Sequence, residues 1–145
     1  MKEILLPATV LVVWTMIMAF WMLLDRGRIL KSNNVSLDKE RPGARGKEIE
    51  AIAAPGADWP GHNYNHLMEQ PTLFYATTVI LALSAYSTLD VVLAWAFVTL
   101  RLVHSIYQAT VNKVPVRGTL FGLSSLVMMV IAVRTLLAVL ALPTL

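Results

Sequence analysis

The chain has 145 residues, enough for one domain, and 57% of them are hydrophobic while only 14% are charged. Soluble proteins carry about 25% charged residues, so this composition argues against a soluble domain. The chain has no cysteine, which excludes disulfides, thiolate metal sites and a cysteine nucleophile. Its cations fall at the ends of apolar segments and not in a basic stripe with interleaved aromatic residues, so no nucleic-acid partner is expected.

Four apolar segments are long enough to cross a bilayer, which takes about 20 residues of helix. Because lipid offers no hydrogen bonds to the backbone, each crossing segment is expected to be helical. The sequence therefore predicts an all-α, integral membrane four-helix bundle that forms a single domain over residues 1–145. The expected helices cover residues 4–26, 62–88, 90–112 and 116–142.

The first apolar segment is expected to be a retained helix and not a signal peptide. Its uncharged run of 21 residues, 4–24, exceeds the signal-peptide core of about 7–15 residues, and Asp25 and Arg26 follow it. A long polar loop, residues 27–61, comes next and contains proline–glycine pairs. Within it, residues 47–54 are predicted to form a short interfacial helix.

The distribution of cations predicts the orientation in the membrane. Lysine and arginine are concentrated between residues 25 and 66 and in the link before the fourth helix, which lies on the same side if there are four crossings. Because cationic loops stay in the cytoplasm, this side is predicted to be cytoplasmic, with both termini outside. A bacterial cytoplasmic (inner) membrane is the expected location.

Several ionisable or polar residues lie within or at the ends of the expected transmembrane helices. Each ionisable group near the bilayer centre costs about 2.5–3.5 kcal/mol on insertion scales, so these residues call for an explanation. Arg101, His104 and Gln108 share one stripe of the third helix because they are three and four residues apart. Further candidates at the same depth are His62, Asn65, His66 and Glu69 in the second helix, Arg26 and Arg28 in the first, and Lys113 and Arg117 before and in the fourth.

These residues are open to several interpretations. Glu69 and Arg101 are a candidate ion pair, His104 a candidate packing residue, and the remaining cations candidate anchors at the cytoplasmic surface. Taken together, however, the cations outnumber Glu69, which favours a site for an anion with more than one negative charge. A metal site built on His62 and His66 is the weaker alternative, because the arginines would repel a divalent cation, so no metal is expected. Arg134 has no evident partner in the chain; Glu3, a subunit contact or snorkelling outward are the alternatives.

Two stretches resemble the MAPEG family, the membrane-associated proteins in eicosanoid and glutathione metabolism, and suggest a bacterial-type member. They are RLVHSIYQATVNKVPVRGTLF, residues 101–121, and NHLMEQPTLFYA, residues 65–76. The resemblance implies a homotrimer of four-helix subunits that binds glutathione, as co-substrate, between neighbouring subunits near the cytoplasmic side. It assigns catalysis to Arg117, which would stabilise the thiolate. It assigns glutathione binding to Arg101, His104, Glu69, Asn65, His66, Gln108, Lys113 and either Arg28 or Arg26.

The expected function is therefore that of a membrane-bound glutathione-dependent transferase or peroxidase. Its lipophilic second substrate would be an electrophile or a lipid hydroperoxide arriving from the membrane lipids. The sequence departs from the family pattern, since Gln108 and Phe121 stand where related enzymes have tyrosines and Gly118 where they have a serine. These departures leave two alternatives: a non-catalytic membrane scaffold or accessory subunit, and an anionic lipid-binding protein.

Overall fold

The computed structural model describes residues 1–35, 43 and 45–143, and its regular secondary structure in these ranges is entirely α-helical. This confirms the expected all-α class. The helices are α1 (Lys2–Ser32), α2 (Gly46–Ile52), α3 (Trp59–Leu67), α4 (Gln70–Leu83), α5 (Thr88–Thr110) and α6 (Val114–Leu140). Three of the described helices, α1, α5 and α6, are long and apolar enough to cross a membrane.

The helix expected over residues 62–88 is two helices in the structure, α3 and α4. Pro71 lies in the first turn of α4, where it has no N–H to donate and its ring would clash with the carbonyl of Leu67 in a continuous helix. Glu69, at the break, has φ −90° and ψ −99°, outside the helical region. The Thr72 backbone N–H and hydroxyl both donate to the Glu69 carbonyl oxygen, at 3.2 and 2.6 Å, and so hold the first turn of α4.

The first helix is longer than the range 4–26 expected from the sequence. Charged residues are compatible with a helix, so α1 continues through Asp25 and Arg26 and ends at Ser32. Asn33 ends it by donating from its side chain to the Ile29 carbonyl oxygen at 2.8 Å. The region expected as the loop 27–61 thus contains the last turns of α1, the predicted short helix, α2, and the first residues of α3.

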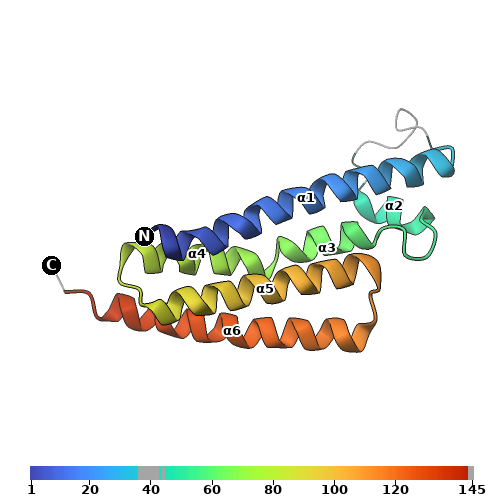
Figure 1. Ribbon diagram of the computed structural model, residues 1–145. Helices are drawn as coiled ribbons and strands as arrows, with labels where there is room; N and C mark the ends of the chain where they lie inside the picture. Colours follow the sequence, from blue (N-terminus) through green and yellow to red (C-terminus); the bar gives the residue numbers. More distant parts are fainter. Residues whose placement is uncertain (36–42, 44, 144–145) are drawn as a thin grey trace.

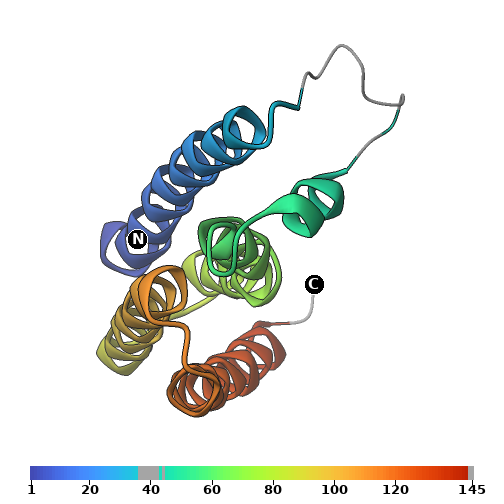
Figure 2. The same ribbon diagram turned by 90° about the vertical axis from the view of Figure 1, so that its right-hand side faces the viewer.

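The helices run side by side, and α3 and α4 follow each other along the same row (Figure 1). Helix α1 packs on α3, α4 and α5, whereas α6 packs on α5 and α4. The end-on view shows α1 and α6 on opposite sides of the body (Figure 2). The N-terminus and the end of α6 lie at one end, and α2 and the α5–α6 link lie at the other (Figure 1). This agrees with the expectation that the polar segment and the link share a side.

Helical spacing explains which apolar side chains form the core. Ile4, Leu11 and Met18 repeat every seven residues along α1 and are at most 1% exposed. Phe74 of α4 and Phe97 of α5 meet with ring centroids 4.5 Å apart. Large apolar side chains also cover the outside, for example Phe20 at 65% and Leu140 at 71% exposed. Such an outer surface suits contact with lipid tails, where close packing and not water exclusion holds helices together.

Candidate functional site

A fully buried arginine lies at the centre of the candidate site. Arg101 of α5 is 0% exposed, and its Nη2 donates to Oε1 of Gln70 at the start of α4. Its Nη1 is 3.4 Å from Nδ1 of His66. The guanidinium lies between two aromatic rings, 5.4 Å from the Phe97 centroid and 5.2 Å from the Phe121 centroid. Its Nε has no hydrogen-bond partner.

Two histidines stack beside this arginine. The rings of His66 and His104 have centroids 4.9 Å apart and an interplanar angle of 29°, which joins α3 to α5. Phe121 of α6 lies 5.2 Å from the His66 ring and so brings the third helix to the cluster. The sequence predicted that His66 and His104 would share a depth, and the structure brings them into direct contact.

A cavity of about 300 Å³ opens next to the histidine pair. It is lined by His66, His104, Gln108, Arg117, Gly118 and Phe121. Arg117, in the first turns of α6, donates from Nη1 to Oδ1 of Asn112 at 2.8 Å. A Cβ atom at Gly118 would meet nothing within 4 Å, so the absent side chain leaves space there.

The cavity has donors and acceptors still to satisfy. Gln108 is 5% exposed, and its Oε1 has no hydrogen-bond partner. Within the described part of the chain, no carboxylate lies within ion-pair distance of Arg101 or Arg117. Because a buried charge is costly unless it is paired, the arrangement calls for an anion that also offers a donor to Gln108.

The expected ion pair between Glu69 and Arg101 does not form in the structure. Glu69 is exposed at the break between α3 and α4, whereas the adjacent Gln70 accepts the hydrogen bond from Arg101. The helix break causes this difference, because the prediction assumed one continuous helix that carries His66 and Glu69 on the same face. Asn65 is also exposed and does not line the cavity.

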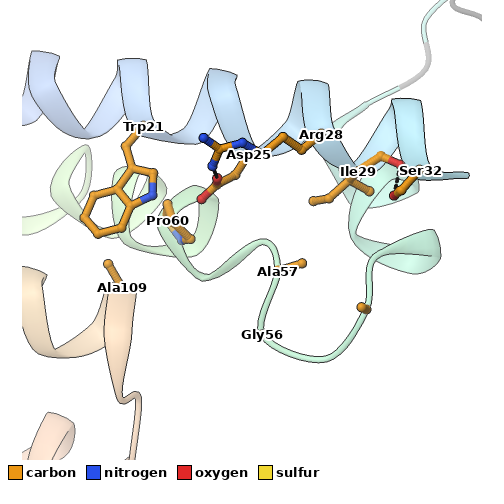
Figure 3. A pocket seen from close by; sticks show the side chains of 10 residues that line it. Trp21, Asp25, Arg28, Ile29, Ser32, Gly56, Ala57, Pro60 and Ala109 are labelled. Carbon is orange, nitrogen blue, oxygen red and sulfur yellow. Dashed lines mark hydrogen bonds and ion pairs between the residues drawn. The ribbon is translucent and has the colours of Figure 1, made fainter.

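The remaining predicted site residues lie away from the cavity within one chain. Arg26 forms an ion pair with buried Asp58 through Nε at 3.0 Å. Arg28, with a side chain 75% exposed, pairs with Asp25 at 2.6 Å and lines a separate cavity between α1 and the segment before α3 (Figure 3). Lys113 is exposed where α6 begins. The structure therefore joins His66, His104, Gln108 and Arg117 around one cavity, with Arg101 directly behind it.

Sequence reasoning missed two amides that support the site. Gln70, which binds Arg101, also donates from Nε2 to the Ser125 hydroxyl of α6 at 3.0 Å. Asn63 is 0% exposed and donates to the Ser105 hydroxyl at 2.6 Å. Asn63 and Leu67 lie four residues apart within α3, and that spacing could have placed Asn63 on the inner face, whereas Gln70 lies beyond the helix break, where the spacing no longer applies.

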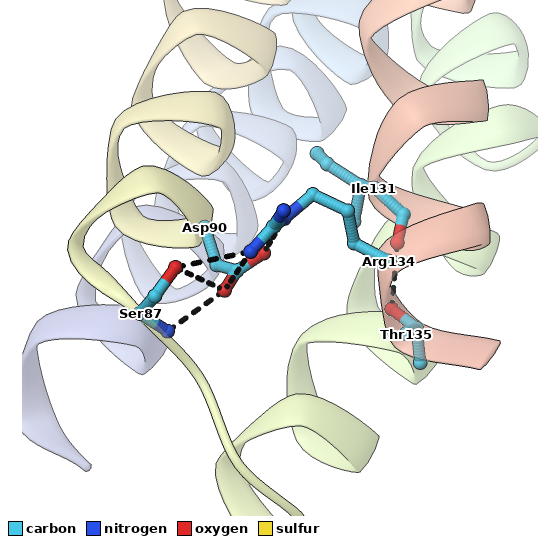
Figure 4. A network of polar contacts seen from close by, with 5 residues as sticks. All are labelled: Ser87, Asp90, Ile131, Arg134 and Thr135. Carbon is cyan, nitrogen blue, oxygen red and sulfur yellow. Dashed lines mark hydrogen bonds and ion pairs between the residues drawn. The ribbon is translucent and has the colours of Figure 1, made fainter. Parts of the chain in front are cut away.

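Arg134 has a partner that the sequence analysis did not identify. It is held by Asp90, in the first turn of α5, and its Nη2 lies 3.1 Å from Oδ2 of Asp90 and 3.0 Å from the Ser87 hydroxyl (Figure 4). Asp90 Oδ2 also accepts from the Ser87 backbone N–H at 2.7 Å. Within the described chain Arg134 therefore pairs with Asp90 and not with Glu3, the partner in the chain that the sequence analysis considered.

The rival metal arrangement does not assemble among the described residues, where no group of three potential ligands gathers. His62 instead lies with its Nε2 3.0 Å from Oε1 of Glu50, which links α3 to α2. His66 faces Arg101 and His104, so the two histidines of the H-x-x-x-H pattern have different neighbours.

Three membrane-competent helices and a buried cationic cluster beside a cavity define a helical membrane protein with a candidate anion site. The chain belongs to the MAPEG family, which matches residues 4–137. This confirms the resemblance and establishes an integral membrane protein. The family includes glutathione transferases, peroxidases and non-catalytic members, and its proteins generally use glutathione. No curated protein and no solved structure matches the chain.

Proposed function

We propose that this protein is a membrane-bound glutathione-dependent transferase or peroxidase that acts on a lipophilic electrophile or a lipid hydroperoxide. The observation that carries the proposal is the cavity that joins Arg117 to the His66–His104 pair. Arg101, which has no carboxylate within ion-pair distance among the described residues, packs against this cavity. Family membership adds that proteins of this kind generally use glutathione.

Glutathione suits the polar groups that the cavity presents. It carries two carboxylates, which the cations at positions 101 and 117 attract, and one ammonium group, which can donate to the unpartnered Oε1 of Gln108. The histidine pair supplies further donors and acceptors on the cavity wall. The chemistry of the lining therefore matches an elongated anion that also carries a donor.

Arg117 is the residue proposed to stabilise the thiolate. A free thiol has a pKa of about 8.5, so only about 3% is the nucleophilic thiolate at pH 7. Lowering that pKa by about two units requires roughly 2.7 kcal/mol of preferential stabilisation of the anion. A guanidinium in the first turns of a long helix can contribute through its own charge and the helix dipole.

The assembly and the orientation belong to the same proposal. The α3–α4 pair would form the fourth crossing, and the end that carries α2 and the α5–α6 link would face the cytoplasm of a bacterial inner membrane. Residues outside the cavity of one chain, namely Asn65, Glu69, Lys113 and Arg26 or Arg28, would reach glutathione only in a homotrimer, where a neighbouring chain brings them to the site.

The test is Arg117→Ala in purified protein, assayed for conjugation of glutathione to 1-chloro-2,4-dinitrobenzene. The thiolate would attack the ring carbon and displace chloride, so loss of the guanidinium should lower kcat/KM at least tenfold. Arg117→Lys should retain part of the activity because it keeps the charge. Lys31→Ala, an exposed cation of α1, is the matched control. Unchanged turnover in Arg117→Ala would remove this residue from the mechanism.

A non-catalytic scaffold is the second candidate, and the composition of the cavity favours it. No hydroxyl or thiol side chain lines the cavity among the described residues, because Gln108, Gly118 and Phe121 occupy the wall. Isothermal titration with glutathione separates the candidates. A scaffold should bind none, an enzyme should bind and turn over, and a site for anionic lipid should bind lipid while ignoring glutathione.

A further inference from the structure

A second cavity, of about 600 Å³, lies between α1 and α2, away from the histidine pair. Its walls are mostly apolar and carry two arginines and one glutamate. The lining residues are Leu23, Arg26, Gly27, Leu30, Val35, Arg45, Gly46, Glu48, Ile49 and Ile52. We call this cavity the α1–α2 groove. Its volume lies within the range of about 300–1,000 Å³ typical of small-molecule sites.

The lining residues form two walls of the groove, one on α1 and one on α2, with a channel between them. Leu23, Gly27 and Leu30 lie on one face of α1 at intervals of four and three residues. Ile49 and Ile52 present the corresponding face of α2. The α1 wall extends about 10 Å, from the rise of 1.5 Å per residue. At its centre Gly27 leaves the channel open, since a Cβ atom there would meet nothing within 4 Å.

Contacts at the side of the groove hold its two walls in place. The Arg26 guanidinium passes close under α2, where a Cβ atom on Gly46 would lie 2.7 Å from its Nη1. The same guanidinium is anchored by Asp58 through two contacts of 3.0 Å. Oε1 of Glu50 in α2 also lies 3.0 Å from Nε2 of His62 in α3. The groove is therefore formed before a ligand enters, which lowers the entropic cost of binding.

The charge and position of the groove identify its occupant. Arg26 is neutralised by Asp58, and the carboxylate of Glu48, which also lines the groove, is engaged in an interaction of its own. Arg45, exposed at the start of α2, has no ion pair among the described residues. The groove begins at Leu23, where the uncharged run of α1 ends, and continues past it. That is the depth at which lipid headgroups meet the hydrocarbon and where a juxtamembrane arginine attracts anions.

We propose that the α1–α2 groove binds a single acyl chain with an anionic head, the chain lying between the apolar walls of α1 and α2 and the head on Arg45. The shared chemistry is an acyl tail plus a carboxylate or phosphate, which a free fatty acid or an anionic bilayer lipid can supply. This site is separate from the cavity proposed for glutathione and does not depend on it.

The experiment uses full-length protein in nanodiscs of neutral lipid with a diazirine-labelled palmitic acid, followed by peptide mapping of the cross-links. Cross-links should concentrate in residues 23–30 and 45–52 and should be displaced by unlabelled palmitic acid but not by hexadecanol. Gly27→Leu fills the channel and should lower this labelling at least fivefold. Arg45→Gln should lower it at least threefold.

Gly122→Leu is the matched control, because Gly122 is also helical with nothing within 4 Å of its Cβ position, and it lies outside the groove. It should label as wild type. A parallel arm replaces the fatty acid with diazirine-labelled phosphatidylglycerol, and preferential labelling by one probe identifies the source. Labelling by neither probe, labelling spread evenly over the outer faces of α1 and α6, or labelling unchanged in both groove variants would overturn the proposal.

Discussion

Two arginines in the α5–α6 hairpin, Arg101 and Arg134, have opposite electrostatic surroundings. Arg134 is held at the end near the termini by the Asp90 carboxylate, whose side chain is 4% exposed. Arg101 lies toward the other end, is 0% exposed, and contacts a neutral amide, a histidine and two aromatic rings. Among the described residues, Arg134 has a carboxylate within ion-pair distance and Arg101 has none.

The comparison separates a structural role from a ligand-binding role. A buried pair with good geometry holds its two helices together, and removing one partner leaves a charge that is expensive to bury. A buried cation without a carboxylate lowers the stability of the unliganded protein, and an incoming anion offsets that cost. Substitutions at the Arg134 pair are thus expected to change the stability of the protein, and substitutions at Arg101 its affinity for a ligand.

The largest effect is expected on the stability of the protein when the Asp90–Arg134 ion pair is broken. Asp90→Asn leaves Arg134 without its counter-charge and should destabilise the protein by about 2–3 kcal/mol. This is less than for a fully buried pair, because the Arg134 side chain is 33% exposed. Thermal unfolding of the protein in detergent measures this. The double variant Asp90→Asn with Arg134→Leu should recover most of the loss. A single variant that melts at the wild-type temperature would show that the pair contributes nothing.

The next largest effect is expected on glutathione affinity when the charge of Arg101 is removed. Arg101→Met keeps a long apolar stem but removes the charge, so glutathione affinity should fall at least 30-fold, about 2 kcal/mol. The melting temperature of the unliganded variant should be unchanged or higher, because an uncompensated buried charge is gone. Titration calorimetry and thermal unfolding check the two halves. A destabilised variant that still binds glutathione would assign Arg101 to structure instead.

The smallest effect is expected from giving Arg101 a neighbouring carboxylate, as Arg134 has in Asp90. Gln70→Glu places a carboxylate where Gln70 now accepts from Arg101, so the unliganded protein should gain stability. The new charge competes with the ligand anion and should weaken glutathione binding about fivefold, roughly 1 kcal/mol. Ser125→Ala is the control, because it removes the contact of Gln70 with Ser125, together with the bond of that hydroxyl to the Phe121 carbonyl, and leaves Gln70 on Arg101. Tighter binding in Gln70→Glu would contradict the charge-balance argument.

The sequence by itself determined the helical class, the membrane setting and most of the residues around the cavity. Those inferences depend on local physics: the length of uncharged runs and the three- and four-residue spacing of polar groups within one helix. His104 and Gln108 were placed correctly on one stripe because both lie in uninterrupted α5. The short helix α2 was also predicted from its local pattern.

Only the tertiary structure decided which groups pair across helices. The break before Pro71 turned Glu69 outward and placed Gln70 on Arg101, which the assumption of one continuous helix could not reveal. The partner of Arg134 is 44 residues away in the sequence, and no local spacing relates Asp90 to it. Periodicity fixes the face of a helix on which a side chain lies, but the rotation and axial offset of the packed helices decide what that side chain meets.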